Sequence, residues 1–143
     1  MLEQIAFGLA LILITTAIHG SCTVAVIRAL RLTHASAWAN RSAATRVCLI
    51  SVVVLMMLLA ALLETGVWTA VYLAVGALPD LETALYFSTV TFTTLGYGDV
   101  TLDANWRLLG SIQAANGTIM FGWTTAIVMA VIHRMATAHE AIQ

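Results

Sequence analysis

The sequence predicts an all-α membrane protein with three membrane-spanning helices, because its composition is strongly apolar and it contains three long apolar runs. Hydrophobic residues make up 61% of the 143 residues and charged residues only 9%, whereas about a quarter of the residues in a typical soluble domain are charged. Each run exceeds the ~20 residues that a helix needs to cross the hydrocarbon of a bilayer. The runs cover residues 2–30, 47–78 and 108–132.

The distribution of arginine predicts the orientation of the chain in the membrane. All six basic residues are arginine, and four of them flank or occupy the segment that follows the first run. Cytoplasmic segments are enriched in basic residues, so we expect the N-terminus outside and the C-terminus in the cytoplasm. The same side chains are candidates for contact with anionic lipid headgroups. These four residues are Arg28, Arg31, Arg41 and Arg46.

The first helix is expected over residues 1–30, followed by a basic cytoplasmic loop over residues 31–46. The start of the chain carries Glu3 and no basic cluster, which argues against a cleaved signal peptide. A short cytoplasmic tail is expected over residues 135–143.

A short helix is predicted between the second and third runs. Pro79 and Asp80 precede it, and aspartate favours the N-cap position. A helix over residues 80–92 is only ~18 Å long and cannot cross a ~30 Å hydrocarbon core. We therefore expect a re-entrant segment between an outer helix over residues 47–78 and an inner helix over residues 106–134. Irregular backbone at that depth is tolerated only where protein buries it or where it lines water.

The loop after the short helix, residues 93–99, reads Thr-Thr-Leu-Gly-Tyr-Gly-Asp. It resembles the selectivity filter of the tetrameric potassium channel family, which reads Thr-Val-Gly-Tyr-Gly and is commonly followed by aspartate. Leu95 stands where the family has valine. The resemblance covers about residues 46–134, and we place the pore domain at residues 47–134. The first helix is then an addition to the family's two-helix plan.

The resemblance implies a channel that conducts K⁺ passively across a bacterial inner (plasma) membrane, and not an enzyme. One chain contributes one filter strand, so a closed ring of ligands implies a homotetramer with cyclic symmetry. Backbone carbonyls and the Thr94 hydroxyl would replace the hydration shell of the ion, and positive φ is expected at Gly96 and Gly98. The side chains of Leu95 and Tyr97 are expected to point away from the axis and to pack behind the loop. The filter residues are Thr94, Leu95, Gly96, Tyr97 and Gly98.

The residues that support the filter must differ from the best-known pattern of the family. Phe87 and Val90 occupy positions that often carry a hydrogen-bonding aromatic residue and a buried glutamate, and neither can supply the bond. A hydrogen bond from Tyr86 to Asp99 is one replacement. The candidate supporting residues are Thr93, Asp99, Tyr86 and Glu64.

Glu64 is the only carboxylate well inside a predicted span, which makes it a functional candidate. Counted from Arg46 it lies ~27 Å from the cytoplasmic surface, whereas His19, counted from Arg28, lies ~13 Å from it. A direct pair of His19 and Glu64 is therefore not expected. Glu64 either contacts the re-entrant helix or the outer interface, or reaches headgroup water near Trp68. His19 is expected to form a hydrogen bond between helices.

Two glycines in the third run are candidate weak points of the inner helix. Gly117 lies close to the spacing of the family's gating hinge, and Gly122 follows it. Glycine eases bending, but small residues also let membrane helices pack closely, and both interpretations stay open. The helical register places Asn116 sideways, toward neighbouring protein. The expected cavity-lining residues are Thr118, Phe121, Thr125 and Met129.

The sequence gives no reason to expect other chemistry. The scattered histidines and cysteines have no metal-site spacing, no nucleophile and base pairing indicates catalysis, and a net charge of −1 argues against a nucleic-acid partner. No cofactor is expected besides K⁺ ions in the filter. His34, His133 and His139 lie on the expected cytoplasmic side, where a pH-sensing role is a weak alternative. A weakly selective cation channel and a non-conducting membrane subunit with the same fold also stay open.

Overall fold

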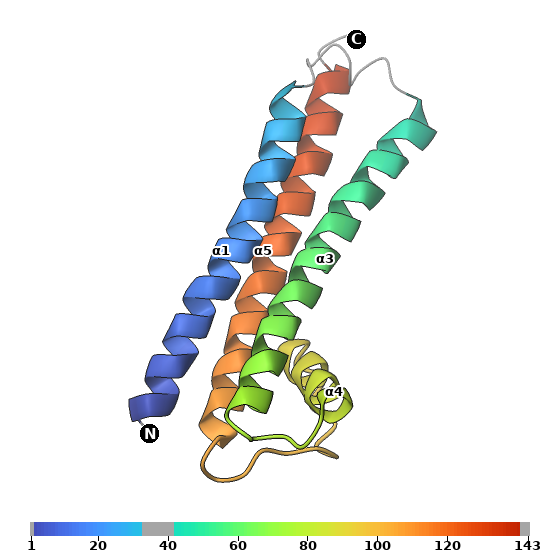
Figure 1. Ribbon diagram of the computed structural model, residues 1–143. Coiled ribbons are helices and arrows are strands. Elements are labelled where there is room, and N and C mark those ends of the chain that lie inside the picture. The colour runs from blue at the N-terminus through green and yellow to red at the C-terminus, as the bar shows by residue number, and fades with distance from the viewer. Residues whose placement is uncertain (1, 33–41, 141–143) are drawn as a thin grey trace.

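The computed structural model describes residues 2–32 and 42–140 and contains four helices within these ranges (Figure 1). Arg41 and His34, for which roles were predicted, lie outside the described residues, and so do the side chains of Arg31 and His139. The helices are α1 (Leu2–Leu32), α3 (Ala43–Ala74), α4 (Leu81–Phe92) and α5 (Arg107–Glu140).

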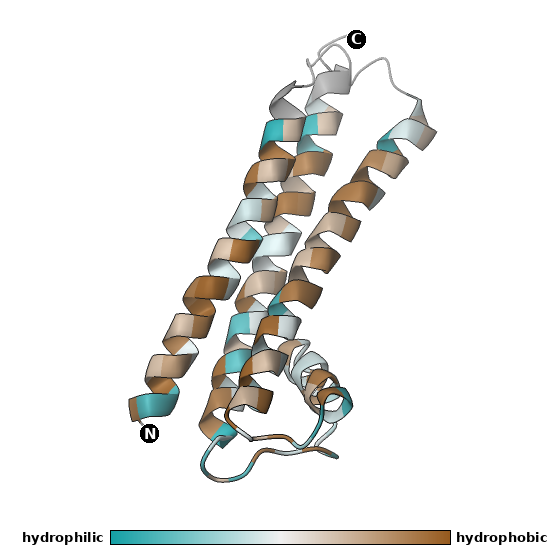
Figure 2. Cartoon of the chain, viewed as in Figure 1, coloured by the Kyte–Doolittle hydropathy of each residue, from teal (hydrophilic) through white to brown (hydrophobic). Residues whose placement is uncertain are grey.

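Three of these helices, α1, α3 and α5, are long and apolar enough to cross a membrane. Apolar residues cover most of the length of each (Figure 2), and hydrophilic residues lie near the ends of the bundle, in the loops and at a few positions along the helices. The chain is therefore a multi-pass, all-α membrane protein, as its composition predicts.

The expected bounds of the outer helix, residues 47–78, are wrong by four residues at each end. The helix α3 begins earlier because the side chain of Ser42 accepts a hydrogen bond from the Thr45 amide at 3.3 Å and caps the first turn. It ends earlier because Gly76 adopts φ +66° and closes the last turn with a Schellman pair of hydrogen bonds. The apolar run continues to residue 78, but glycine ends the helix.

The helices α1 and α5 extend past their predicted ends at residues 30 and 134. An apolar run ends where the lipid ends, but nothing in the backbone forces a helix to stop there, because its hydrogen bonds are internal. Residues 31–32 and 43–46 of the predicted loop and residues 135–140 of the predicted tail are therefore helical.

The helix α4 is the predicted short helix, and its start is capped as expected. The Thr83 amide donates to Asp80 Oδ1 at 2.9 Å, and the Thr83 hydroxyl donates to Asp80 Oδ2 at 2.9 Å. With 12 residues, α4 is about 18 Å long and packs against both α3 and α5 at one end of the bundle (Figure 1).

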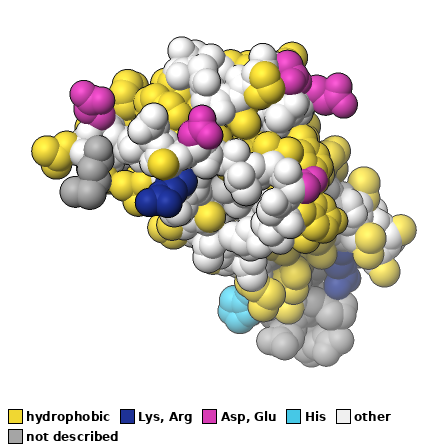
Figure 3. Space-filling model, turned by 90° about the horizontal axis from the view of Figure 1, so that it is seen from below, with side chains coloured by type: hydrophobic (Ala, Val, Ile, Leu, Met, Phe, Trp, Pro, Cys, Tyr) yellow, Lys and Arg dark blue, Asp and Glu magenta, His cyan; other side chains and the backbone are white. Residues whose placement is uncertain are grey.

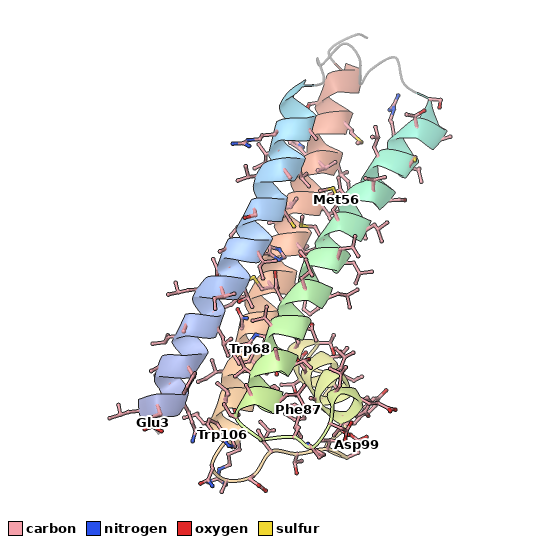
Figure 4. All side chains as sticks on the ribbon, viewed as in Figure 1. Glu3, Met56, Trp68, Phe87, Asp99 and Trp106 are labelled. Atoms are coloured by element: carbon pink, nitrogen blue, oxygen red, sulfur yellow. The ribbon has the colours of Figure 1, made fainter. Side chains whose placement is uncertain are left out.

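Two apolar clusters hold the bundle together. The one around α4 joins it to α3 and α5 through Trp68, Tyr72, Phe87, Phe92, Leu109 and Met120. The second lies toward the other end, between the three long helices, and contains Val26, Val53, Met57, Val131 and Met135. Figure 4 shows Trp68 on α3 and Phe87 on α4 within the first region.

The helices α4 and α5 approach each other closely at Gly117. A Cβ atom added to this glycine would lie 1.9 Å from the carbonyl oxygen of Phe92 and 2.8 Å from its carbonyl carbon. The last residue of α4 therefore rests directly on the backbone of α5, which favours the packing interpretation of Gly117. A Cβ atom added to Gly122 would meet no atom within 4 Å in the described part of the chain.

Buried polar side chains fix the position of α1 on the other helices. The imidazole of His19 bonds Glu64 Oε1 on α3 through Nδ1 at 2.9 Å and lies 3.3 Å from Thr124 Oγ1 on α5 through Nε2. Asn116 Nδ2 on α5 donates to Thr15 Oγ1 on α1 at 2.9 Å. The expected interhelical role of His19 and the sideways direction of Asn116 are confirmed.

The expectation that His19 and Glu64 do not pair was wrong. It assumed that both helices run straight through the membrane from arginines at one level, but α3 leans away from α1 and α5 toward its start (Figure 1), so it gains less depth per residue. Side chains also tilt toward the N-terminus of their own helix, and in this antiparallel pair the two side chains extend toward each other. Glu64 consequently contacts His19 on α1, whereas the sequence predicted a contact with the short helix, with the outer interface or with headgroup water.

We predict that His19→Leu destabilises the protein more than the double variant His19→Leu/Glu64→Leu does. The single variant leaves a carboxyl group buried without its partner, which costs about 3 to 5 kcal/mol, whereas replacing both partners by apolar groups is often neutral. Unfolding by sodium dodecyl sulfate in mixed micelles measures the difference. A double variant less stable than the single variant would contradict this account.

The close contact at Gly117 gives a second prediction. Gly117→Ala should lower the free energy of unfolding by about 1 to 3 kcal/mol or more, because a backbone carbonyl cannot move aside as a flexible side chain can. Gly122→Ala is the matched control and should be neutral or stabilising, since alanine favours helix by up to about 1 kcal/mol. Thermal unfolding of the purified protein in detergent measures both. Equal effects of the two substitutions would show that the contact does not constrain the fold.

Candidate functional site

The segment 93–99 is attached to the last turn of α4 by backbone hydrogen bonds. The amides of Leu95 and Gly96 both donate to the carbonyl of Val90, at 3.0 and 3.3 Å, and the Thr94 amide donates to the carbonyl of Thr91 at 3.0 Å. The position of the segment therefore follows the position of α4.

The backbone of this segment alternates in the sign of φ. Thr94, Gly96 and Gly98 have φ of +59°, +56° and +78°, whereas Leu95 and Tyr97 have negative φ. In an ordinary strand successive carbonyls point to opposite sides, and alternating the sign of φ allows successive carbonyls to be turned toward one side. The predicted positive φ of the two glycines is confirmed.

Positive φ at Thr94 was not predicted, because the residue is β-branched and resists this conformation. A non-glycine residue in the left-handed region costs about 1 to 2 kcal/mol. Such strain persists only where the surrounding structure imposes it, and it is concentrated at functional sites. The alternation therefore includes Thr94, whose own conformational preference opposes positive φ.

The side chains of Leu95 and Tyr97 do not pack behind the loop within this chain. They are 55% and 67% exposed, so the chain itself does not provide the predicted packing. Within the described part of one chain, two large side chains next to a strained backbone are therefore uncovered.

One hydrogen bond ties the end of the segment back to α4. The Tyr86 hydroxyl donates to Asp99 Oδ2 at 2.6 Å, and the Val100 amide donates to Asp99 Oδ1 at 3.0 Å, so the contact predicted between Tyr86 and Asp99 is confirmed. The hydrogen bond from Tyr86 holds the pKa of Asp99 below its ordinary value, and the same bond raises the pKa of Tyr86. Figure 4 shows Asp99 at the end of the molecule that α4 occupies. The hydroxyl of Thr93, another predicted supporting residue, donates to the carbonyl oxygen of Thr89 on α4 at 2.8 Å.

A cluster of buried polar side chains, which was not predicted, links α4 to its two neighbouring helices. Its members are Tyr72 on α3, Ser88 on α4 and Gln113 on α5, and each side chain is fully buried. A glutamine within an apolar run is the signal that could have found it, because polar side chains inside a span need partners.

The residues expected to line a cavity form one uncovered face of α5, which continues from the end of α4. Thr118, Phe121, Thr125 and Met129 are all exposed. The ring of Phe121 contacts that of Phe92 edge to face, with centroids 5.9 Å apart. The face therefore begins beside the last residue of α4.

The end of the molecule that carries the segment is acidic. Figure 3 views this end and shows several acidic side chains spread over it. Four of the seven acidic residues of the chain lie between residues 79 and 107, where Arg107 is the only basic residue. The acidic residues are Asp80, Glu82, Asp99 and Asp103. Negative charge around an opening attracts cations.

Comparison with known proteins identifies the family. The family model described as "Ion channel" matches residues 47–134, the range predicted as a pore domain, and leaves α1 outside the match. No curated protein and no solved structure matches the chain. The match confirms the family that the sequence of the loop suggested. Because the matched residues make up more than half of the 143-residue chain, the protein belongs to the ion channel family.

Proposed function

We propose that four copies of this chain form a K⁺-selective channel, with segment 94–98 of each copy as one wall of the filter. The alternating sign of φ over this segment is the observation that carries the proposal. Carbonyl oxygens turned toward one side can replace the hydration shell of K⁺ when four such strands face a common axis. On this basis Thr94, Leu95, Gly96 and Tyr97 supply carbonyl ligands, and Gly98 allows the strand to turn.

The uncovered side chains support an assembly of several copies. Leu95 and Tyr97 are exposed beside the filter, and so are Phe121 and Met129 on the adjoining face of α5. In a tetramer, the first two would pack against a neighbouring subunit, and the α5 face would line a cavity below the filter. The assembly would thus supply the contacts that the single chain lacks.

The direction of α4 supports a cation as the permeating ion. Its C-terminal end, at Phe92, leads directly into the filter, and the C-terminus of a helix carries about half a negative charge. The acidic residues of the same end would add to the local concentration of cations.

The arginines support an orientation with the filter end outside a bacterial plasma membrane. Arg28, Arg46 and Arg134 lie toward the ends of the helices opposite to α4. Basic residues gather on the cytoplasmic side, which places the start of α1 outside. Arg28 and Arg46 would there contact anionic headgroups.

Reversal potentials of purified protein in liposomes test the proposal. With K⁺ and Na⁺ in equal and opposite gradients, a selective channel should approach about 59 mV for each tenfold gradient of K⁺. Gly96→Ala should abolish the flux, because alanine resists the φ of +56° at this position. The matched control is Gly66→Ala on α3, where an added Cβ meets no atom within 4 Å.

Each alternative has its own outcome in this assay. A reversal potential near zero would indicate a weakly selective cation channel. Absence of flux from verified tetramers would indicate a non-conducting membrane subunit. A current unchanged by Gly96→Ala would show that ions do not use the proposed path.

Acid sensitivity tests the hydrogen bond between Tyr86 and Asp99. Because the pKa of Asp99 is held below its ordinary value of 3.8, the bond to its carboxylate is present at neutral pH and is lost only as the pH falls below that value. Tyr86→Phe removes the bond, so the pKa of Asp99 should return toward its ordinary value and its carboxylate should bind a proton at higher pH. The acid-induced loss of K⁺ flux should therefore move to higher pH. Titration of flux against external pH measures the midpoint.

The background Asp99→Asn separates this bond from other effects of the same substitution. Without the carboxyl group, Tyr86→Phe should leave the midpoint where it is. A shift of equal size in both backgrounds would mean that Tyr86 acts through another partner.

A further inference from the structure

Gln113 connects the three helices that surround the base of the filter. Its side chain is fully buried. Its Nε2 donates to the carbonyl oxygen of Ser88 at 3.2 Å and to Ser88 Oγ at 2.7 Å, and its Oε1 accepts from the Tyr72 hydroxyl at 2.7 Å. One amide on α5 thus binds both α3 and α4.

The direction of the Gln113 amide is fixed by its partners. The carbonyl of Ser88 can only accept a hydrogen bond, so the amide nitrogen must face it, and the hydroxyl of Tyr72 then donates to the amide oxygen. Ser88 Oγ in turn donates to the carbonyl of Thr65 on α3 at 2.9 Å. Ser88 is therefore held from α5 on one side and from α3 on the other.

These bonds act on α4 in a way that its apolar contacts do not. The rings of Phe87 and Phe92 pack α4 against α3 and α5. Hydrophobic contact is non-directional, however, and permits a helix to rotate or slide slightly. Hydrogen bonds depend steeply on distance and angle. Those of Ser88 therefore fix the rotation of α4 about its axis and its position along that axis.

The backbone of the filter depends on the rotation of α4 and on its position along the helix axis. Val90, whose carbonyl receives the amides of Leu95 and Gly96, lies two residues after Ser88, or about 3 Å along the helix axis. A rotation of α4 at Ser88 would move the Val90 carbonyl and with it the two amides of the filter.

We propose that Gln113 is a positioning residue for the filter, which it holds through Ser88 and α4 without touching the ion. The proposal rests on the proposed function for its effect on ion choice. Its effect on the order of the filter backbone does not depend on conduction. Tyr72 orients the Gln113 amide by donating to its oxygen, and Ser88 accepts the hydrogen bonds that its nitrogen donates.

Three variants and one control test the proposal by reversal potential in liposomes. Gln113→Leu removes both sets of bonds, Gln113→Glu loses the donor to the Ser88 carbonyl, and Ser88→Ala loses the hydroxyl partner. Each should lower the permeability ratio of K⁺ to Na⁺ by about fivefold to tenfold, the size expected for the loss of one or two hydrogen bonds. The effects of Gln113→Leu and Ser88→Ala should be non-additive in the double variant, because the residues act through one contact.

Asn116→Leu is the matched control. This variant also removes a fully buried amide from α5, but that amide binds Thr15 on α1 and not α4. It should lower stability to a similar extent and leave the permeability ratio unchanged. If all variants retain the ratio of the unmodified protein, or if Asn116→Leu lowers it equally, Gln113 has only a structural role and the proposal is overturned.

Hydrogen exchange of the Leu95 and Gly96 amides keeps the proposal testable if the protein does not conduct. Gln113→Leu, Gln113→Glu and Ser88→Ala should each raise the exchange rates of these amides by about fivefold or more, and Asn116→Leu should not. Unchanged rates in all variants would overturn the positioning role. Raised rates in a protein without K⁺ preference would uphold the positioning role and refute the proposed function.

Discussion

The contact between the carbonyl of Phe92 and the backbone of α5 at Gly117 is the constraint on which the half of the molecule that contains α4 depends. Only glycine leaves room for it, since a Cβ atom would lie 1.9 Å from the carbonyl oxygen. The contact sets how far α4 enters between α3 and α5. The segment 93–99 begins where α4 ends, so the same contact sets the depth of the candidate filter.

Polar groups inside the bundle then fix what close packing leaves free. Lipid offers no hydrogen bonds, so a polar side chain in a span must find its partner on another helix. Gln113 and Ser88 meet this need between α5 and α4, and His19 and Glu64 meet it between α1 and α3. Without α1, Glu64 would lose its partner and face lipid, so the helix outside the matched family range is an integral part of the fold.

What the sequence predicts correctly follows from rules that act over a few residues. The cap at Asp80, the positive φ of Gly96 and Gly98 and the reach of Tyr86 to Asp99 are all local. The pairing of His19 with Glu64 depends on the tilt of α3, and that of Gln113 with Ser88 on the relative rotation of two helices. Neither quantity can be read from one sequence, because lipid-facing and protein-facing positions are both apolar in a span.

The backbone of the candidate filter and the proposed assembly explain each other. A β-branched residue, Thr94, is held at φ +59°, and the side chains of Leu95 and Tyr97 beside it are uncovered. Within the described chain the segment is held by the Val90 carbonyl and by the bond between Tyr86 and Asp99, both of which act through α4. A subunit packed against Leu95 and Tyr97 would hold the opposite side of the strand. The strain at Thr94 would then be balanced only in the assembly, so that the geometry needed to bind the ion and the interface between subunits would form together.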